Sequence, residues 1–187
     1  MKPIDTRYRV AVGLHYPAFF PSEAIEQIRE IVPRAILALG VETGAVHAEL
    51  ILQPDGRVRI VEMAARPGGG HIFHTVVLQV SGINMVQEFA KMLMGMEPRL
   101  KPHYARGAAY RFFHPPQGRI REVKGVQETT SMEGVLALGI QVKPGDVIGE
   151  LVGQHHRAGY VVTAGETRDE AVARAHAVER AIIFDME

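Results

Sequence analysis

The chain has 187 residues, 47% of them hydrophobic, which is enough for one medium-sized core or two small ones. Basic and acidic side chains balance at 21 each, which argues against nucleic acid or a membrane surface as the partner and favours small or charged metabolites. Without cysteine there is no disulfide and no thiolate metal site, and because no N-terminal apolar segment resembles a signal peptide or a spanning helix, a cytoplasmic location is expected.

Strand and helix patterns alternate over the first hundred residues. Residues 8–15 alternate as in a strand. A segment that opens at Pro21-Ser22 then has apolar residues at helical spacing from Ile25 to Leu39, with Gly40 where a helix ends. Pro33 lies inside this segment and predicts a kink or a split into two helices. The patterns then predict strands at 45–53 and 57–64 and helices at 72–80 and 84–94.

The rest of the chain shows short strands and one final helix. Thr167 and Glu170 form a capping box for an amphipathic helix that extends to Ile182. The sequence pattern changes to short strands near Pro98 to Pro102, which indicates a subdomain boundary. The predicted strands lie near 107–113, 119–124, 135–141 and 160–164, with a turn at 143–146.

Two carboxylates, Glu49 and Glu62, lie inside the apolar runs that flank Pro54-Asp55-Gly56, a strong turn signal. A two-residue loop pairs Glu49 with Glu62 across a β-hairpin, and a four-residue loop keeps this register, whereas a three-residue loop shifts every pair by one. We expect the register of the two-residue loop. It places Glu49 opposite Glu62, Ile51 opposite Ile60, Leu50 opposite Val61 and Ala48 opposite Met63.

The expected pair of opposed acids needs compensation, because their Cβ atoms are about 5 Å apart and like charges at that spacing are destabilising. A divalent cation is the natural compensator, since Mg²⁺ takes hard oxygen ligands and accepts water and substrate phosphates for the rest of its octahedron. A shared proton, or a solvated face with nearby arginines, is the alternative. Spacing alone leaves these alternatives open.

An arginine and three glycines follow the second acid. Arg66 lies four residues beyond Glu62, and an arginine beside a metal carboxylate suits a transferring phosphoryl group, whose charge it stabilises. Gly68, Gly69 and Gly70 let the backbone approach a ligand closely and present N–H groups to an anion. For the glycines taken alone, a flexible turn into the next helix is the better interpretation.

This segment resembles a known family. The stretch GAVHAELILQPDGRVRIVEMAARPGGGHI is similar to the paired metal-binding strands of the ATP-grasp fold, in the branch of carboxylate-amine ligases that includes biotin carboxylase and the L-amino acid ligases. ALGVETGAVHAEL and SGINMVQEFAKMLMG resemble the entry to the first metal strand and the helix that closes the domain. Residues 107–182 are similar to the small domain that follows it. Ala64 departs from many members, which carry an asparagine ligand there, but the Ala-Ala-Arg-Pro-Gly-Gly form resembles the amino acid ligase subgroup.

The resemblance implies an α+β fold. Residues 1–100 would form the C-terminal part of an ATP-grasp domain, an antiparallel sheet with helices, and residues 101–187 a small α+β domain. The implied activity joins a carboxylate to an amine, or to a thiol, at the expense of ATP and through an acyl-phosphate.

The resemblance also implies roles for individual residues. Glu49 and Glu62 would bind Mg²⁺ or Mn²⁺ and, through it, ATP, while Arg66 would be catalytic. The residues implied to bind the carboxylate substrate are Gly68, Gly69, Gly70 and His71.

The residues before Gly44 are too few for the lid subdomain and the substrate domain that precede this segment in the family. We therefore expect a fragment, a split-gene subunit whose partner polypeptide supplies the missing half, or a truncated relic, and we expect the chain alone to be inactive. A non-catalytic regulatory or small-molecule binding module is the alternative function, and a homo-oligomer is a further alternative assembly.

Several histidines and one arginine need a role. His47 lies two residues before Glu49, and packing or substrate contact is preferred over zinc for His71 and His74, because no further ligands lie at metal spacing. For Arg111, on a predicted strand, a surface position is as well supported as one facing the active site. The pair His155-His156 lies in a loop-like stretch, where exposed side chains are expected.

Overall fold

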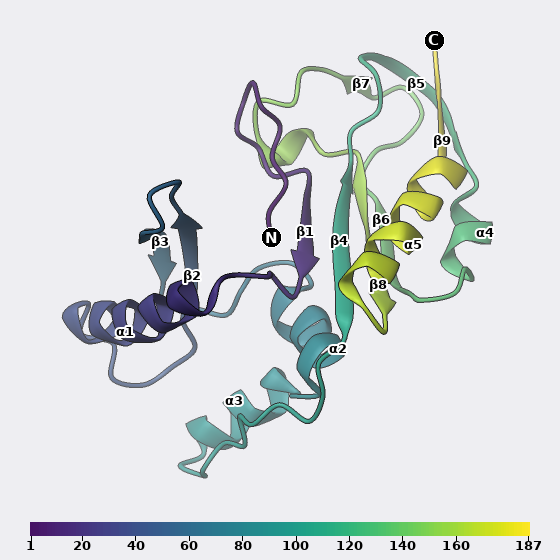
Figure 1. Cartoon of the computed structure of the whole chain (residues 1–187). Helices are drawn as coiled ribbons and strands as arrows, with labels where there is room; N and C mark the ends of the chain where they lie inside the picture. The colour runs from purple at the N-terminus through teal and green to yellow at the C-terminus, as the bar shows by residue number, and fades with distance from the viewer. The chain divides into compact units, whose positions relative to one another are not determined.

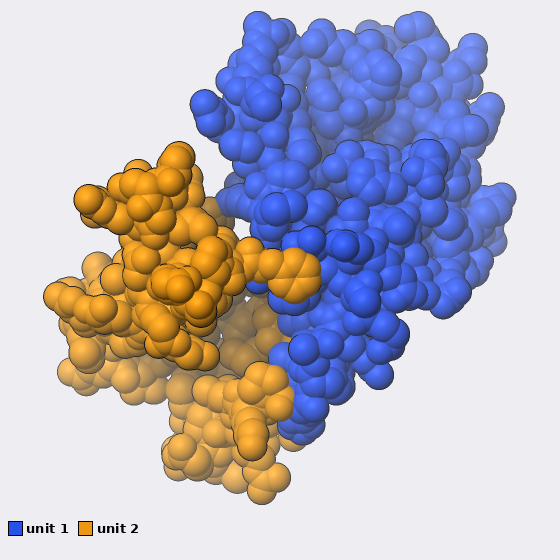
Figure 2. All heavy atoms as spheres, viewed as in Figure 1, with its two compact units in different colours: residues 1–18, 79–82, 103–187 blue, residues 19–78, 83–102 orange.

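The computed structural model describes residues 1–187 as two compact units (Figure 2). Unit 1 consists of Met1–Ala18, Gln79–Gly82 and His103–Glu187, and unit 2 consists of Phe19–Leu78 and Ile83–Pro102. The first 18 residues therefore belong with the C-terminal part of the chain and not with the helix that follows them. The expected division of the chain into two domains at residue 100 stays a prediction.

Unit 2 contains a long helix, a β-hairpin and a second helical region (Figure 1). Gln27 connects the helix to the hairpin turn, because its amide nitrogen donates to the Gly56 carbonyl at 2.9 Å and its amide oxygen accepts from the Val58 nitrogen at 2.9 Å. The elements are α1 (Ser22–Ala38), β2 (His47–Leu52), β3 (Val58–Ala64), the π-helical turn η1 (Ile72–Val76), α2 (Val77–Ser81), whose last three residues belong to unit 1, and α3 (Met85–Leu93).

Helix α1 is continuous through Pro33, so the predicted split is wrong. Pro33 and Arg29, four residues earlier, are both exposed, and water can occupy the position that the missing N–H leaves at the Arg29 carbonyl. Gly40 has a φ of +69° and follows the helix as expected. Gly82, with a φ of +75°, lies at the predicted break between α2 and α3.

Unit 1 contains two antiparallel sheets and the C-terminal helix. The first sheet has the order β1-β4-β8-β6, with strands at Gly13–Tyr16, Gly107–Phe113, Gly159–Gly165 and Val135–Ile140. The second has the order β7-β5-β9, with strands at Val147–Ile148, Gly118–Lys124 and Ile183–Met186. The helical elements are α4 (Val126–Thr130), η2 (Gln154–His156) and α5 (Arg168–Ala181), and α5 packs against β4 and β8.

The hydrophobic core of unit 1 combines small and large residues. Ala171 and Ala175 on α5 and Ala109 on β4 are almost fully buried, so the helix approaches the sheet closely. The same close approach requires a glycine at position 107, at the start of β4, because a Cβ there would lie 2.0 Å from the Thr167 carbonyl oxygen. The rest of the buried cluster consists of Phe113, Ile120, Ile148, Ala158, Val161, Val178 and Ile182.

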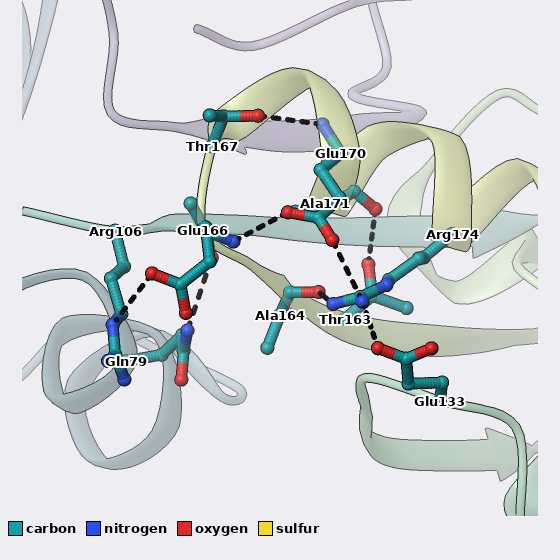
Figure 3. Close-up of polar contacts among 11 residues, drawn as sticks. Gln79, Arg106, Glu133, Thr163, Ala164, Glu166, Thr167, Glu170, Ala171 and Arg174 are labelled. Atoms are coloured by element: carbon teal, nitrogen blue, oxygen red, sulfur yellow. Dashed lines mark hydrogen bonds and ion pairs between the residues drawn. The ribbon is translucent and has the colours of Figure 1, made fainter.

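The first turn of α5 is held by a polar network (Figure 3). Thr167 accepts from the Glu170 nitrogen at 3.2 Å, as the predicted capping box requires, while the Glu170 carboxylate accepts from the Glu166 nitrogen at 2.8 Å. Arg174 donates to the Ala164 carbonyl at 2.9 Å and pairs with Glu170 at 2.8 Å and with Glu133. The network joins the start of the helix to β8.

The predicted strands near 107–113, 119–124, 135–141 and 160–164 are confirmed, as is the α+β fold class. The first strand begins at Gly13 and not at Tyr8, because the chain turns back between Asp5 and Val10. Three short elements, β7, α4 and β9, have no periodic pattern long enough to predict them. No helix has the length and apolar character needed to cross a membrane.

Candidate functional site

The β2–β3 hairpin places Glu49 opposite Glu62, as predicted, but by a different route. The loop has three residues, since the Gln53 nitrogen donates to the Arg57 carbonyl at 2.9 Å and Gly56 takes a φ of +80°. The pairs beside the turn are consequently shifted by one residue, as a three-residue loop requires. Between the Leu50–Ile60 and Glu49–Glu62 pairs, β3 has one extra residue, Val61, which forms a β-bulge. This bulge restores the expected register at the acids.

The predicted pairs near the turn are therefore wrong. Leu50 lies opposite Ile60 and Ile51 lies opposite Arg59, whereas the Ala48–Met63 pair is as expected. The cause is local, because the three-residue loop offsets the pairs beside the turn by one residue and the bulge removes this offset before the acids.

Both acids lie on one face of the hairpin, because directly paired residues point to the same side of a sheet. Glu49 is partly buried, and its carboxylate lies 3.8 Å from Nε2 of His47, on the same strand face. Glu62 is exposed and has neither a hydrogen-bond partner nor an ion-pair partner. The alternative in which arginines neutralise Glu62 is therefore not observed.

Arg66 follows the hairpin at the end of β3. Its backbone nitrogen donates to the Ala64 carbonyl at 2.9 Å, and its guanidinium donates to the Pro67 carbonyl at 2.9 Å. The side chain is exposed and pairs with no carboxylate. Its donors remain available to an anion near the paired acids.

The three glycines differ in what their backbone positions require. A Cβ on Gly68 would lie 3.1 Å from Nδ1 of His47 and 3.1 Å from Ile72, so this glycine allows close packing. Gly70 has a φ of +58°, a backbone conformation that other residues rarely adopt. Around Gly69 there is open space, which leaves its backbone accessible.

His71 is the N-cap residue of the π-helical turn η1. Its Nδ1 lies 3.3 Å from the Thr75 hydroxyl, and its ring centroid lies 5.1 Å from that of His74. Burial, and then the neighbouring His74, lower the pKa of His71 below its ordinary value of 6.5, so its ring is neutral at pH 7. It can serve as a hydrogen-bonding group but not as a fixed cation.

Hairpin and glycine segment together present two carboxylates, one arginine and an open stretch of backbone. No group of three or more His, Cys, Asp or Glu side chains lies together anywhere in the chain, so a cation here would take at most two protein carboxylates. That donor set suits Mg²⁺, which keeps several waters and binds substrate phosphates. It does not suit a structural zinc site, which needs four protein ligands.

Other residues singled out in the sequence lie in unit 1. Arg111 forms a bidentate pair with Glu179 of α5, with Nε 3.1 Å from both carboxylate oxygens, so its role is a contact between sheet and helix. His155 and His156 lie in η2 and line a cavity with Arg157 that the sequence did not indicate. The only signal for it is the cluster of three basic residues itself.

Comparison with known proteins agrees with this fold. Residues 111–187 match the family described as L-amino acid ligase C-terminal domain 2. A relative from Sinorhizobium fredii, the uncharacterized protein y4rH, is 26% identical over 159 residues, which are 84% of this chain and 33% of the relative. The chain thus spans about a third of that protein.

Solved structures extend the likeness to the whole chain. The L-amino acid ligase from Bacillus licheniformis is 23% identical with a TM-score of 0.80, over 95% of this chain and 44% of that one. The phosphoribosylglycinamide synthetase from Anaerococcus prevotii is 20% identical with a TM-score of 0.82, over 100% of this chain and 48% of that one. The whole chain therefore shares the fold of about half of each of these two solved structures, and its residues 111–187 match the model of the L-amino acid ligase C-terminal domain 2.

Proposed function

We propose that this chain is the metal- and phosphoryl-binding portion of an ATP-dependent ligase that joins a carboxylate to an amine or a thiol through an acyl-phosphate. The observation that carries the proposal is the pairing of Glu49 with Glu62 on one face of the hairpin. Two directly opposed carboxylates destabilise a hairpin unless a cation joins them. A binding role accounts for a pair that stability alone does not favour.

Glu49 and Glu62 would hold Mg²⁺ or Mn²⁺, and a bound ion would there neutralise the charge of the ATP phosphates. The exposure of Glu62 and its lack of an ion-pair partner support this assignment, because its oxygens are free to act as ligands. His47, 3.8 Å from Glu49, would orient that carboxylate from the side.

Arg66 would stabilise the phosphoryl group during transfer. Its guanidinium is exposed four residues after Glu62 and gives one donor to Pro67, which leaves the other donors for phosphate oxygens. The open backbone at Gly69 and the neutral ring of His71 would contact the carboxylate substrate. Gly68 would allow the close packing against His47 and Ile72, and Gly70 would provide the positive φ that the backbone of this segment needs.

The chain covers less than half of the solved ligases that it resembles, so the rest of the proposed active site would come from residues outside it. The nucleotide lid and most of the substrate pocket would belong to that remainder. It would be supplied either by the same longer polypeptide or by a partner polypeptide.

Binding of Mn²⁺, followed by electron paramagnetic resonance, tests the metal site without turnover. We expect millimolar binding by the full chain, weakened at least about tenfold by Glu62→Gln or Glu49→Gln. Glu42→Gln is the matched control, because Glu42 is exposed, has no partner and lies outside the hairpin. Equal binding by the wild type and Glu62→Gln would remove the basis of the proposal.

Titration with Mg-ATP tests the second half of the proposal. The chain alone should bind Mg-ATP weakly and hydrolyse none, whereas addition of the polypeptide encoded beside it should give phosphate release that depends on Arg66. If Mg-ATP binds but the complete assembly releases no phosphate, the regulatory alternative is favoured over the ligase.

A further inference from the structure

A cavity of about 730 Å³ lies in unit 1, and all of its lining residues belong to this one unit. Its functional lining comes from β4, β8 and the turn η2, and no acidic side chain takes part. The aromatic and basic residues of the lining are Tyr110, Phe112, His155, His156, Arg157 and Tyr160. Nothing in the proposed ligase chemistry uses them.

A cluster of three aromatic rings forms one side of the cavity. The centroids of Tyr110 and Phe112 are 4.6 Å apart, and the rings of Tyr110 and Tyr160 meet edge to face at 5.6 Å. The remaining apolar lining comes from Val142, Val147 and Ile148. Rings of this kind favour a flat, apolar ligand body over a chain of hydroxyl groups.

Arg157 is the one permanently charged residue of the lining, and it has an unusual environment. Its guanidinium carbon lies 3.5 Å from the centroid of the Phe112 ring, and it donates to the Ala11 carbonyl at 2.7 Å and to the Gln154 side chain at 3.4 Å. It has no carboxylate partner. Its Nε is buried without an acceptor, and burial lowers the pKa of Arg157 from its ordinary value.

The other partly buried arginines of unit 1 differ from Arg157 in this respect. Arg111 pairs with Glu179, and Arg174 pairs with Glu133 and Glu170. Glu150, which follows the cavity residue Gly149, is already engaged by Arg7 and Tyr8. Arg157 is thus a half-buried cation without a counter-ion, a state that an anionic ligand would relieve.

We propose that this cavity binds a small aromatic carboxylate, with its ring against the cluster of Tyr110, Phe112 and Tyr160 and its carboxylate on Arg157. A single guanidinium matches a singly charged carboxylate better than a phosphate, whose sites combine several cations or backbone N–H groups. The buried Nδ1 of His156, the residue before Arg157, has no partner and adds a second polar group to the lining. The inference is independent of the proposed ligase function, because none of the hairpin residues lines this cavity.

The test measures binding of 3-phenylpropionate to the full chain by calorimetry, with 3-phenylpropanamide and inorganic phosphate as comparison ligands. We expect a dissociation constant of about 0.1–1 mM for the carboxylate and at least about tenfold weaker binding of the neutral amide and of phosphate. Arg157→Gln should weaken carboxylate binding at least about tenfold, and Arg157→Lys should weaken it less. Arg180→Gln is the matched control, because Arg180 is exposed and lies on α5 outside the cavity.

A second variant keeps the test informative if Arg157→Gln unfolds. Gly149 lines the cavity, and a Cβ there meets no atom within 4 Å, so Gly149→Leu adds a large side chain to the lining without a clash at its first atom. It should abolish binding while the circular dichroism spectrum stays unchanged. The proposal is overturned by the absence of binding at about 10 mM. Equal affinity for the amide, tighter binding of phosphate, or binding that survives Gly149→Leu would overturn it as well.

Discussion

The two units differ in how much apolar surface they bury. Unit 1 has a contiguous core built from two sheets and a helix, whereas the buried residues of unit 2 are only Ala24, Val58, Val76, Ile83 and Glu88. Most of the exposed large apolar side chains also belong to unit 2, among them Phe19, Leu37, Leu39, Ile51, Val61, Leu93, Met94 and Met96. The unit with the candidate active site is thus the one with the smaller core, and its stability depends more on polar contacts and turns.

The largest effect on the free energy of unfolding is expected from replacing a phenylalanine of unit 1, in comparison with a phenylalanine of unit 2. Phe113 is 2% exposed in the core of unit 1, and Phe113→Ala should lower the free energy of unfolding by about 3–5 kcal/mol. Phe19 is 68% exposed in unit 2, and Phe19→Ala should change it by less than about 0.5 kcal/mol. Urea unfolding followed by circular dichroism measures both, and comparable losses would contradict the contrast between the units.

The second prediction concerns the buried acid of unit 2. The Glu88 carboxylate accepts from Lys91 at 2.7 Å and from the Arg99 nitrogen at 2.6 Å, and these bonds, led by that from Lys91, lower the pKa of Glu88 below its ordinary value of 4.5. Its contribution to stability is complete above pH 4.5 and is lost as the pH falls through the lower folded pKa. Protection of the α3 amides against hydrogen exchange should therefore decrease on acidification through this range.

A matched pair of variants assigns this effect to Glu88. In Glu88→Gln the acid-dependent part of the protection should disappear, whereas Glu97→Gln, an exposed change beyond the end of α3, should retain it. Persistence of the full pH dependence in Glu88→Gln would show that another group stabilises this part of unit 2.

The third prediction concerns two neighbouring glycines of unit 2. Gly68→Ala places a methyl group 3.1 Å from His47 and from Ile72 and should lower the free energy of unfolding by about 1 kcal/mol. Gly69→Ala, in open space, should change it by less than about 0.5 kcal/mol. Thermal melts of the two variants decide whether the packing around His47 is as tight as the structure shows, and equal melting temperatures would indicate that it is not.

The smallest effect is expected at the paired acids. Glu62→Gln should leave the metal-free chain equally stable or raise its free energy of unfolding by no more than about 0.5 kcal/mol, because it removes like-charge repulsion. Millimolar Mg²⁺ should then stabilise the wild type but not the variant. A large loss of melting temperature in metal-free Glu62→Gln would instead give this carboxylate a structural role.

Local patterns predicted much of this molecule correctly. The four longer strands of unit 1, β4, β5, β6 and β8, and the capping of α5 follow from periodicity and cap residues that act over a few positions. The Glu49–Glu62 pair was also predicted, although through a two-residue loop where the chain has a three-residue loop and a bulge. Two opposite shifts of one residue cancel at the acids, which a pattern of alternation cannot reveal.

The sequence by itself determined the types of the longer elements and the α+β class, because each depends on neighbours in the chain. Only the tertiary structure decided which distant segments meet. Strand β1 joins the C-terminal sheet by pairing with β4, and Arg157 donates to Ala11, which lies 146 positions away. The aromatic cavity and its unpaired arginine arise from such contacts, whose partners are selected by shape and burial across the whole fold and leave no periodic signal in the sequence.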